Sequence, residues 1–394
     1  MTSEIDLRAI LTPVSNAVGY AKFYNRSHNA VIHVYDDAGK VIETHEHRGD
    51  LGLVKVLLAS HRTSHLKRVI GGGKQLNIQV IMNFRWFGGA VLCLFLVSLG
   101  VICASMVAAP QLDAPRFIQR FHAGTYPQGM AFDGANIWIT NQQDGEVTKL
   151  RASDGALLGT FPAGGPSIDA AFDGVNVWVT NILANTVTRL RASDGTLVDT
   201  LPAGGGAPRA ILFDGANIWV TSLGNTVSKL QKSDGAILGT FPAGSGPFGL
   251  AFDGTNIWVS DYYGNTVTKL RASDGVLQGT FAVGSFPVGV VSDGESVWVT
   301  NIADNTLSKL RASDGALLYT VAVGMGPADV VFDGRYLWVC NEVDNTVMRL
   351  DPSDGRILGT YAVHQMVPQN LLFDGSNIWI SNFYSRSVCK ITLP

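Results

Sequence analysis

The sequence predicts an all-β fold, a seven-bladed β-propeller over residues 116–394. Three observations support this prediction. A phrase such as FDGANIWITN, which begins at Phe132, returns again and again along the chain. Seven of the eight tryptophans recur once per unit, 39 to 41 residues apart, at Trp138, Trp178, Trp219, Trp258, Trp298, Trp338 and Trp379. Each unit also divides into four short segments rich in Val, Ile, Thr and Trp, as strands are. A period near 40 residues with four strands per unit is typical of β-propellers.

The first unit shows the four expected strands in order. PQGMAF is followed by a turn at Asp133-Gly134, then come NIWIT and EVTKLRA, and a turn at Ser153-Asp154-Gly155 leads to ALLGTF. Asp-Gly between strand-like runs is a strong hairpin signal, because glycine accepts the positive φ of tight turns. The repeated aspartates fit this turn chemistry better than calcium binding, since no further carboxylate follows at the spacing of a calcium loop.

The fourth strand predicts how the ring closes. The first three strands occur seven times, but the fourth-strand phrase follows only the first six units. Its seventh copy is FIQRFHAG, which begins at Phe117 and precedes the first unit. We therefore expect the segment near Ile118 to lie beside the last strand, near Ile391, and to complete the seventh blade. Such closure leaves no blade short of a strand.

An apolar run precedes the propeller, within residues 82–110. Residues 86–109 carry no charge, and a bilayer core needs about 20 such residues in a helix. Between residues 51 and 86 there are six basic residues and no acidic one, which predicts that the N-terminal side stays in the cytoplasm. If translation starts at Met82 rather than Met1, the same run resembles an export signal. The alternatives of a retained anchor and a cleaved signal stay open, but both place the propeller in the periplasm or outside the cell.

Residues 1–81 form a separate N-terminal segment, which is absent from the mature protein if Met82 is the start. The stretch 30–47 alternates in polarity on either side of residues 36–40, which predicts a β-hairpin. Its histidines fit a solvated polar face better than a metal site.

Composition excludes several classes of function. The chain has a net charge of −3, whereas nucleic-acid binding requires a basic face. Four cysteines without Cys-X-X-Cys or Cys/His spacing predict neither a disulfide framework nor a zinc site. The chain shows no nucleophile elbow and no phosphate-binding glycine loop.

The repeats differ mainly in the loops on one face of the ring. If the first strand of each unit is innermost, the FDG and SDG turns share one face and barely change. The loops after the second strands and before the first strands share the other face and vary. Because binding residues usually sit in loops on a rigid scaffold, we take this variable face as the candidate ligand site. Its polar and aromatic residues, expected around the channel mouth, are Gln128, Asp169, Arg209, Asp261, Tyr262, Tyr263, Asp329, Glu342, His364, Gln369, Tyr384 and Arg386.

The repeat unit, PxGxxFDGxNIWVTNxxxNTVxKLxxSDG, resembles the YVTN-type propeller repeats of bacterial exported proteins. It is also similar to the propellers of the streptogramin (virginiamycin B) lyase superfamily. The resemblance covers residues 116–394. The lyase branch implies a metal-assisted elimination that opens a cyclic depsipeptide lactone, with a histidine base and acidic partners. His364 is the histidine that could serve as the base here, and Glu342 is a candidate acidic residue.

The sequence favours a binding scaffold in the cell envelope, either membrane-anchored or secreted. Its ligand would be a protein, a glycan or a small molecule held at the variable face, with no cofactor. The alternative is a lyase or lactonase that uses the same face together with a divalent metal such as magnesium. A purely structural envelope protein is the third interpretation.

Overall fold

The computed structural model describes residues 30–35, 41–47, 118–363 and 365–393. The chain divides into two compact units, residues 1–107 and 108–394. In the first unit, β1 (Ala30–Tyr35) pairs antiparallel with β2 (Val41–His47), at the place where the sequence predicts a hairpin. The predicted apolar helix at 86–109 lies outside the described residues. Among the residues that are described, no helix is long and apolar enough to span a membrane.

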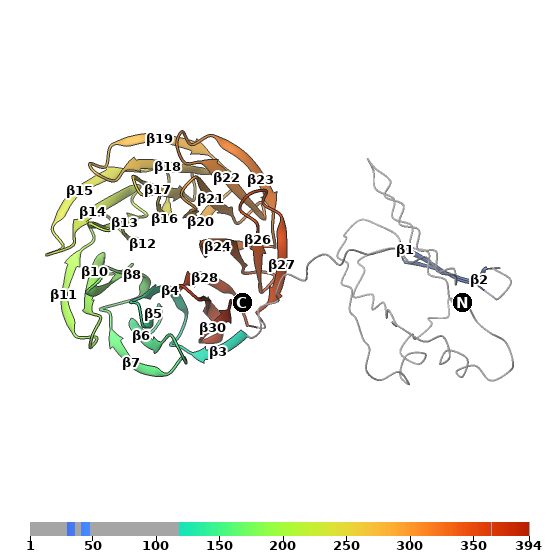
Figure 1. The fold of residues 1–394 in the computed structure, drawn as a ribbon, viewed down its shortest axis with the longest axis horizontal. Coiled ribbons are helices and arrows are strands. Elements are labelled where there is room, and N and C mark those ends of the chain that lie inside the picture. The colour runs from blue at the N-terminus through green and yellow to red at the C-terminus, as the bar shows by residue number, and fades with distance from the viewer. Residues whose placement is uncertain (1–29, 36–40, 48–117, 364, 394) are drawn as a thin grey trace. The chain divides into compact units, whose positions relative to one another are not determined.

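Residues 118–363 and 365–393 contain seven four-stranded antiparallel sheets arranged around a central axis, as Figure 1 shows. We number them as blades 1 to 7, each given from its inner to its outer strand. Blades 1 and 2 are β4 (Pro127–Phe132), β5 (Asn136–Asn141), β6 (Glu146–Arg151) and β7 (Leu157–Pro162), then β8 (Ser167–Phe172), β9 (Asn176–Asn181), β10 (Thr186–Arg191) and β11 (Leu197–Pro202). Blades 3 and 4 are β12 (Pro208–Phe213), β13 (Asn217–Ser222), β14 (Thr226–Gln231) and β15 (Ile237–Pro242), then β16 (Pro247–Phe252), β17 (Asn256–Asp261), β18 (Thr266–Arg271) and β19 (Leu277–Ala282).

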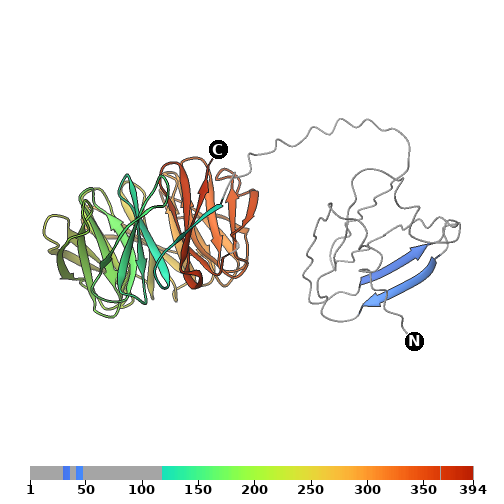
Figure 2. The ribbon, with the colours of Figure 1, turned by 90° about the horizontal axis from the view of Figure 1, so that it is seen from below.

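The remaining blades follow the same pattern. Blades 5 and 6 are β20 (Pro287–Ser292), β21 (Ser296–Asn301), β22 (Thr306–Arg311) and β23 (Leu317–Ala322), then β24 (Pro327–Phe332), β25 (Leu337–Asn341), β26 (Thr346–Leu350) and β27 (Ile357–Ala362). Blade 7 is β28 (Pro368–Phe373), β29 (Asn377–Asn382), β30 (Ser387–Thr392) and β3 (Ile118–His122), with the short 3-10 helix η2 (Phe383–Ser385) between β29 and β30. The first strand of each unit is therefore innermost, as the sequence predicts. Figure 2 shows the strands from the side.

The closure of the ring is confirmed. Strand β3 pairs antiparallel with β30, and Ile118 lies opposite Ile391 in the register. The N-terminal strand thus supplies the outer strand of the last blade (Figure 1).

The recurrent tryptophan is the largest fully buried side chain between neighbouring blades. All seven blade tryptophans are fully buried. Trp178 of blade 2, for example, packs against Ile218, Val220 and Leu230 of blade 3. Trp379 of blade 7 packs against blade 1 in the same way, so the apolar core runs around the whole ring. Each blade therefore buries its faces against its neighbours rather than within itself.

The repeated FDG or SDG aspartate holds this tryptophan in place. In blade 2, one oxygen of Asp173 accepts the N–H groups of Val175 and Asn176, and the other accepts Nε1–H of Trp178 at 2.7 Å. The equivalent indole bond is 2.7 or 2.8 Å long in the other six blades. The predicted turn chemistry is confirmed, and the aspartate also accepts the buried indole N–H, a bond that sequence analysis did not predict.

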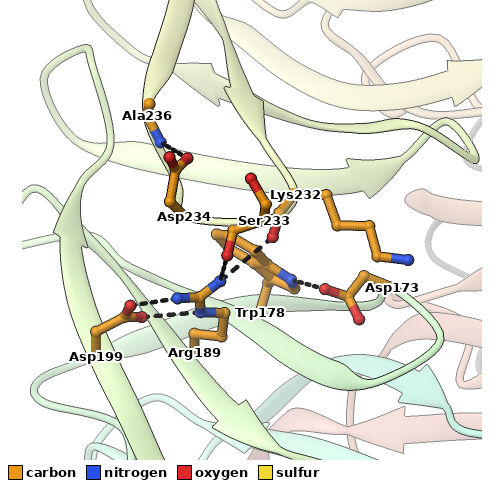
Figure 3. Close-up of polar contacts among 8 residues, drawn as sticks. All are labelled: Asp173, Trp178, Arg189, Asp199, Lys232, Ser233, Asp234 and Ala236. Carbon is orange, nitrogen blue, oxygen red and sulfur yellow. Dashed lines mark hydrogen bonds and ion pairs between the residues drawn. The ribbon is translucent and has the colours of Figure 1, made fainter.

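A basic side chain on the third strand bridges to the next blade. Arg189 lies over Trp178, pairs with Asp199 and donates to the carbonyls of Lys232 and Ser233 in blade 3 (Figure 3). Six of the seven equivalent side chains make such a bond to the following blade within the described residues. Arg349 of blade 6 differs, because its Nε and Nη2 are buried and have no hydrogen-bond partner among the described residues.

Candidate functional site

The variable loops pair with one another around the channel mouth. In each blade the loop after the second strand donates a backbone hydrogen bond to the loop before the inner strand, as Tyr262 N does to Gly246 O in blade 4. The two sets of loops therefore form one continuous surface, which we call the loop face. Because these bonds use backbone atoms, they do not depend on which side chains the loop face carries.

A cavity of about 590 Å³ occupies the channel. Residues of all seven inner strands line it, together with Tyr262, Ile302 and Glu342 from the loops that follow the second strands. A second hollow of about 460 Å³ lies on the loop face between blades 6 and 7, where Tyr384 and Met366 form part of its wall. Glu342 and Gln369 border both spaces. The site is thus a channel with a side recess, large enough for a typical small-molecule ligand.

One position of the inner strands carries the two aspartates of the channel. The third residue of each inner strand is Gly129, Asp169, Ala210, Gly249, Gly289, Asp329 or Asn370. Small residues leave room here, since a side chain on Gly129 would meet Asp169, and one on Gly289 would meet Asp329.

Each of these aspartates is held by backbone N–H groups. Asp169 accepts hydrogen bonds from Ala170 N at 2.8 Å and from Ile211 N, in the next blade, at 3.0 Å. Asp329 accepts a hydrogen bond from Leu371 N, which also lies in the next blade, at 2.9 Å. The two carboxylates therefore brace neighbouring blades while their side chains line the cavity.

Burial changes the protonation of both channel aspartates. It raises the pKa of Asp169 to about 6, although the N–H donors and the charge of Arg209 oppose the rise. It raises the pKa of Asp329 to about 7, and the like charge of Asp169 adds to this effect. Burial also raises the pKa of Glu342. Acidic groups with raised pKa values in a cavity are typical of functional sites.

An arginine and three aromatic rings form one side of the channel mouth. The guanidinium of Arg209 lies 3.5 Å from the ring centre of Phe248. Tyr262 stacks against Phe248 with the ring centres 5.4 Å apart, and Phe286 stacks against Tyr262 at 4.9 Å. Burial lowers the pKa of Arg209 to about 10, while Asp169 acts against this change, so the side chain remains cationic at neutral pH. Its Nε has no hydrogen-bond partner within the described residues.

A second aromatic group lies where blade 7 meets blade 1. Tyr126 stacks on Phe383 with the ring centres 4.6 Å apart, and Tyr384 meets both rings edge-on. Phe383 and Tyr384 also line the side recess. The recess is therefore apolar on the side of blade 7 and acidic at Glu342.

The structure brings most of the predicted site residues together. The channel is lined by Gln128, Asp169, Arg209, Tyr262, Asp329, Glu342 and Gln369. Tyr384 lines the recess. Tyr263 is 66% exposed and contacts Tyr262 edge-on, and Arg386 is exposed at the end of η2. Both lie on the loop face but line neither cavity. His364 lies outside the described residues.

Asp261 differs from the expectation. It is fully buried at the end of β17 and lines neither cavity. Its carboxylate accepts hydrogen bonds from Gly244 N, Thr266 and Thr268 inside blade 4. The equivalent residue is asparagine in five other blades, and in blades 1 and 5 its side-chain oxygen accepts the N–H of the equivalent glycine, Gly124 or Gly284. Asp261 is therefore a structural residue of the scaffold.

Sequence reasoning missed several residues of the site. Phe248, Ile302 and Asn370 line the channel, and Phe286 and Phe383 extend its aromatic groups. Phe248 and Asn370 were recognisable, since each occupies an inner-strand position at which the seven units disagree. Among the residues described, no group of three or more His, Cys, Asp or Glu side chains is arranged to hold a metal ion.

Comparison with known structures relates the fold to that of virginiamycin B lyase and streptogramin B lyase. No family model and no curated protein matches the sequence. A catalytically inactive variant of virginiamycin B lyase from Staphylococcus aureus, solved with quinupristin, aligns with a TM-score of 0.62 and 22% identity, over 71% of this chain and 99% of that one. The selenomethionine form of that enzyme gives the same values. A streptogramin B lyase structure aligns with a TM-score of 0.61 and 18% identity, over 71% of this chain and 98% of that one. These likenesses establish the fold, and the resemblance predicted from the repeats is confirmed at that level.

Proposed function

We propose that the protein is a binding scaffold for a small-molecule ligand, which it holds in the channel and its side recess on the loop face. The observation that carries this proposal is where the seven units differ. Buried positions repeat from blade to blade, whereas the channel positions vary: the second residue of the inner strand changes among glutamine, arginine, phenylalanine and aliphatic residues, and the third changes among glycine, alanine, aspartate and asparagine. A scaffold that served only a structural role would need no cavity with such convergent polar and aromatic groups.

The apolar run at 86–109 supports a location in the cell envelope, with the propeller periplasmic or extracellular and either anchored or secreted. In that setting the loop face meets solutes outside the cytoplasm. A protein or glycan ligand would use the broad outer surface of the loops, whereas the cavity of about 590 Å³ in the channel favours a small molecule.

A lyase or lactonase is the second candidate. Its support is the fold shared with virginiamycin B lyase, together with the raised pKa values of Asp169, Asp329 and Glu342 in the channel. An acid with a raised pKa is suited to proton transfer near neutral pH. Incubation of the full-length protein with quinupristin and magnesium, followed by mass spectrometry, tests this activity. Opening of the lactone that is lost in a Glu342→Gln variant would establish the enzyme.

The binding proposal is tested by a screen of small, chemically diverse compounds with ligand-observed NMR. The full-length protein is compared with a Tyr262→Ala variant, which removes the middle ring of the aromatic stack. The matched control is Val175→Ala, a change at a 59% exposed residue of the FDG face. We expect bound compounds to lose affinity in the first variant and to keep it in the second. Compounds that bind all three proteins equally would show that the channel is not the site.

A further inference from the structure

The charges in the channel are unevenly distributed. Arg209 of blade 3 and Asp169 of blade 2 carry opposite charges that stabilise each other in the channel. Blade 6 contributes Asp329 and Glu342, and the described residues offer neither of them a basic partner. When these two acids are ionised, the cavity therefore carries an uncompensated negative charge on the side of blade 6.

The surroundings of Asp329 leave this charge unsatisfied. Its carboxylate accepts backbone N–H groups and faces Asp169, a second carboxylate, from the other side of the ring. Cys340, the residue opposite Asp329 in the strand register, lies close to both Asp329 and Glu342. Burial raises the pKa of the Cys340 thiol well above its usual range, so this group stays neutral. Backbone dipoles thus provide the only stabilisation of the anion that the described residues supply.

The adjoining wall of the channel is apolar. Blade 5 contributes Val288, Val290 and Ile302 to the cavity, next to Asp329 of blade 6. Tyr262 of blade 4 continues this wall toward the mouth. A ligand in the channel therefore meets an anionic group and a hydrocarbon surface side by side.

Resting on the proposed function, we infer that the ligand is an organic cation, a protonated amine that carries an apolar group. Its ammonium group lies against Asp329 and Glu342 of blade 6, and its apolar group lies against Val288 and Ile302 of blade 5. A buried carboxylate is costly unless a counterion pairs with it, and such a ligand supplies that counterion. An anionic ligand would have only Arg209 among the described lining residues, and this charge is already shared with Asp169.

The inference is tested with three probes of similar shape and different charge. They are 2-phenylethylamine as the cation, 2-phenylethanol as the neutral compound and 3-phenylpropanoate as the anion. Each is titrated into the full-length protein at pH 7.5 by isothermal calorimetry or ligand-observed NMR. We expect the amine to bind at least about tenfold more tightly than the alcohol, and the carboxylate to bind most weakly.

Variants assign the preference to blade 6. Asp329→Asn and Glu342→Gln should each bring the amine close to the affinity of the alcohol, while the alcohol itself binds as before. The matched control is Asp354→Asn, which removes an exposed carboxylate from the SDG turn of the same blade. Its affinity for the amine should not change. A melting curve for each variant confirms that it is folded.

Two kinds of result overturn the inference. If the carboxylate binds best, or if the amine keeps its affinity in both blade 6 variants, the ligand is not a cation held there. Equal binding of amine and alcohol that is lost in Tyr262→Ala would leave the channel as the binding site but refute its charge preference. Absence of binding by all three probes at millimolar concentration, or displacement of the amine by magnesium chloride alone at equal ionic strength, would also refute it.

Discussion

Replacement of Asp261 by asparagine should stabilise the propeller at neutral and alkaline pH. Asp261 is fully buried, and burial raises its pKa to about 6, although hydrogen bonds from Thr268, Thr266 and Gly244 oppose the rise. Asn301 occupies the equivalent position in blade 5. Its carbonyl oxygen accepts Gly284 N at 3.1 Å, and its amide donates to Thr306 and Ser308 at 3.0 and 2.9 Å. An asparagine at 261 can therefore bond to the same three partners without burying a charge, as acceptor from Gly244 N and as donor to the two threonine hydroxyls.

The size and sign of this effect follow from the pKa. An unfolded aspartate titrates near 3.9, and a difference of about two in pKa corresponds to about 3 kcal/mol. Because the folded pKa is the higher one, the folded state disfavours the ionised form. The resulting loss of stability is absent below about pH 4, grows as the pH rises and is complete above about pH 7. The variant lacks this loss, so its advantage over the wild type should reach about 3 kcal/mol, or about 6 °C in melting temperature, at pH 8.

Melting temperatures of the wild type and Asp261→Asn, measured by calorimetry from pH 4 to pH 8, test this reasoning. The difference between the two proteins should widen over that range. Asn301→Asp is the converse control, which should destabilise blade 5 with the same pH dependence. An Asp261→Asn variant that is less stable than the wild type at pH 8, or a difference that does not vary with pH, would refute the explanation.

Three further outcomes are expected. Lys269→Met should lower the free energy of unfolding by about 2–4 kcal/mol, because it leaves the buried carbonyl of Ala312 and that of its neighbour unpaired. Arg349→Met should change it by less than about 1 kcal/mol, because two nitrogens of Arg349 already lack a partner within the described residues. Denaturant titration compares the two variants, and equal losses would contradict the bridging role of Lys269. In the same assay, Asp214→Ala should lower the free energy of unfolding by about 2–4 kcal/mol, because it removes the acceptor of the buried Trp219 indole N–H and of two backbone N–H groups. An unchanged free energy of unfolding would refute this role of the aspartate. The affinity for 2-phenylethylamine, measured by calorimetry, should rise from pH 5.5 to pH 8, because the two channel aspartates, with pKa values of about 6 and 7, ionise over this range. An affinity that falls as the pH rises would contradict the charge pairing.

The fold could be predicted from the sequence because each blade repeats the same physical solution. The tryptophan spacing gave the number of blades, and the displaced fourth-strand phrase placed the strand near Ile118 beside the one near Ile391. Both inferences depend on patterns that the chain repeats within itself. The apolar run at 86–109 occurs once and lies outside the described residues, so its role stays a prediction.

The candidate site could be predicted only in part. Asp169, Arg209 and Asp329 stood out because charged residues interrupt the inner strands at variable positions. Asp261 lies one residue before a variable loop, and only the alignment of blades shows that it replaces a buried asparagine. Phe248 was missed because an apolar residue in a strand is usually part of the core, whereas its position here borders the channel.

The claim that the loop face and channel form the binding site is tested most directly by hydrogen–deuterium exchange with mass spectrometry, with and without the tightest ligand from the screen. The account predicts slower exchange on binding in the loops that precede β12, β20, β24 and β28 and in the loops that follow β17 and β25. The FDG and SDG turns on the opposite face should exchange at the same rate in both samples. Protection confined to those turns, with the channel loops unchanged, would contradict the account.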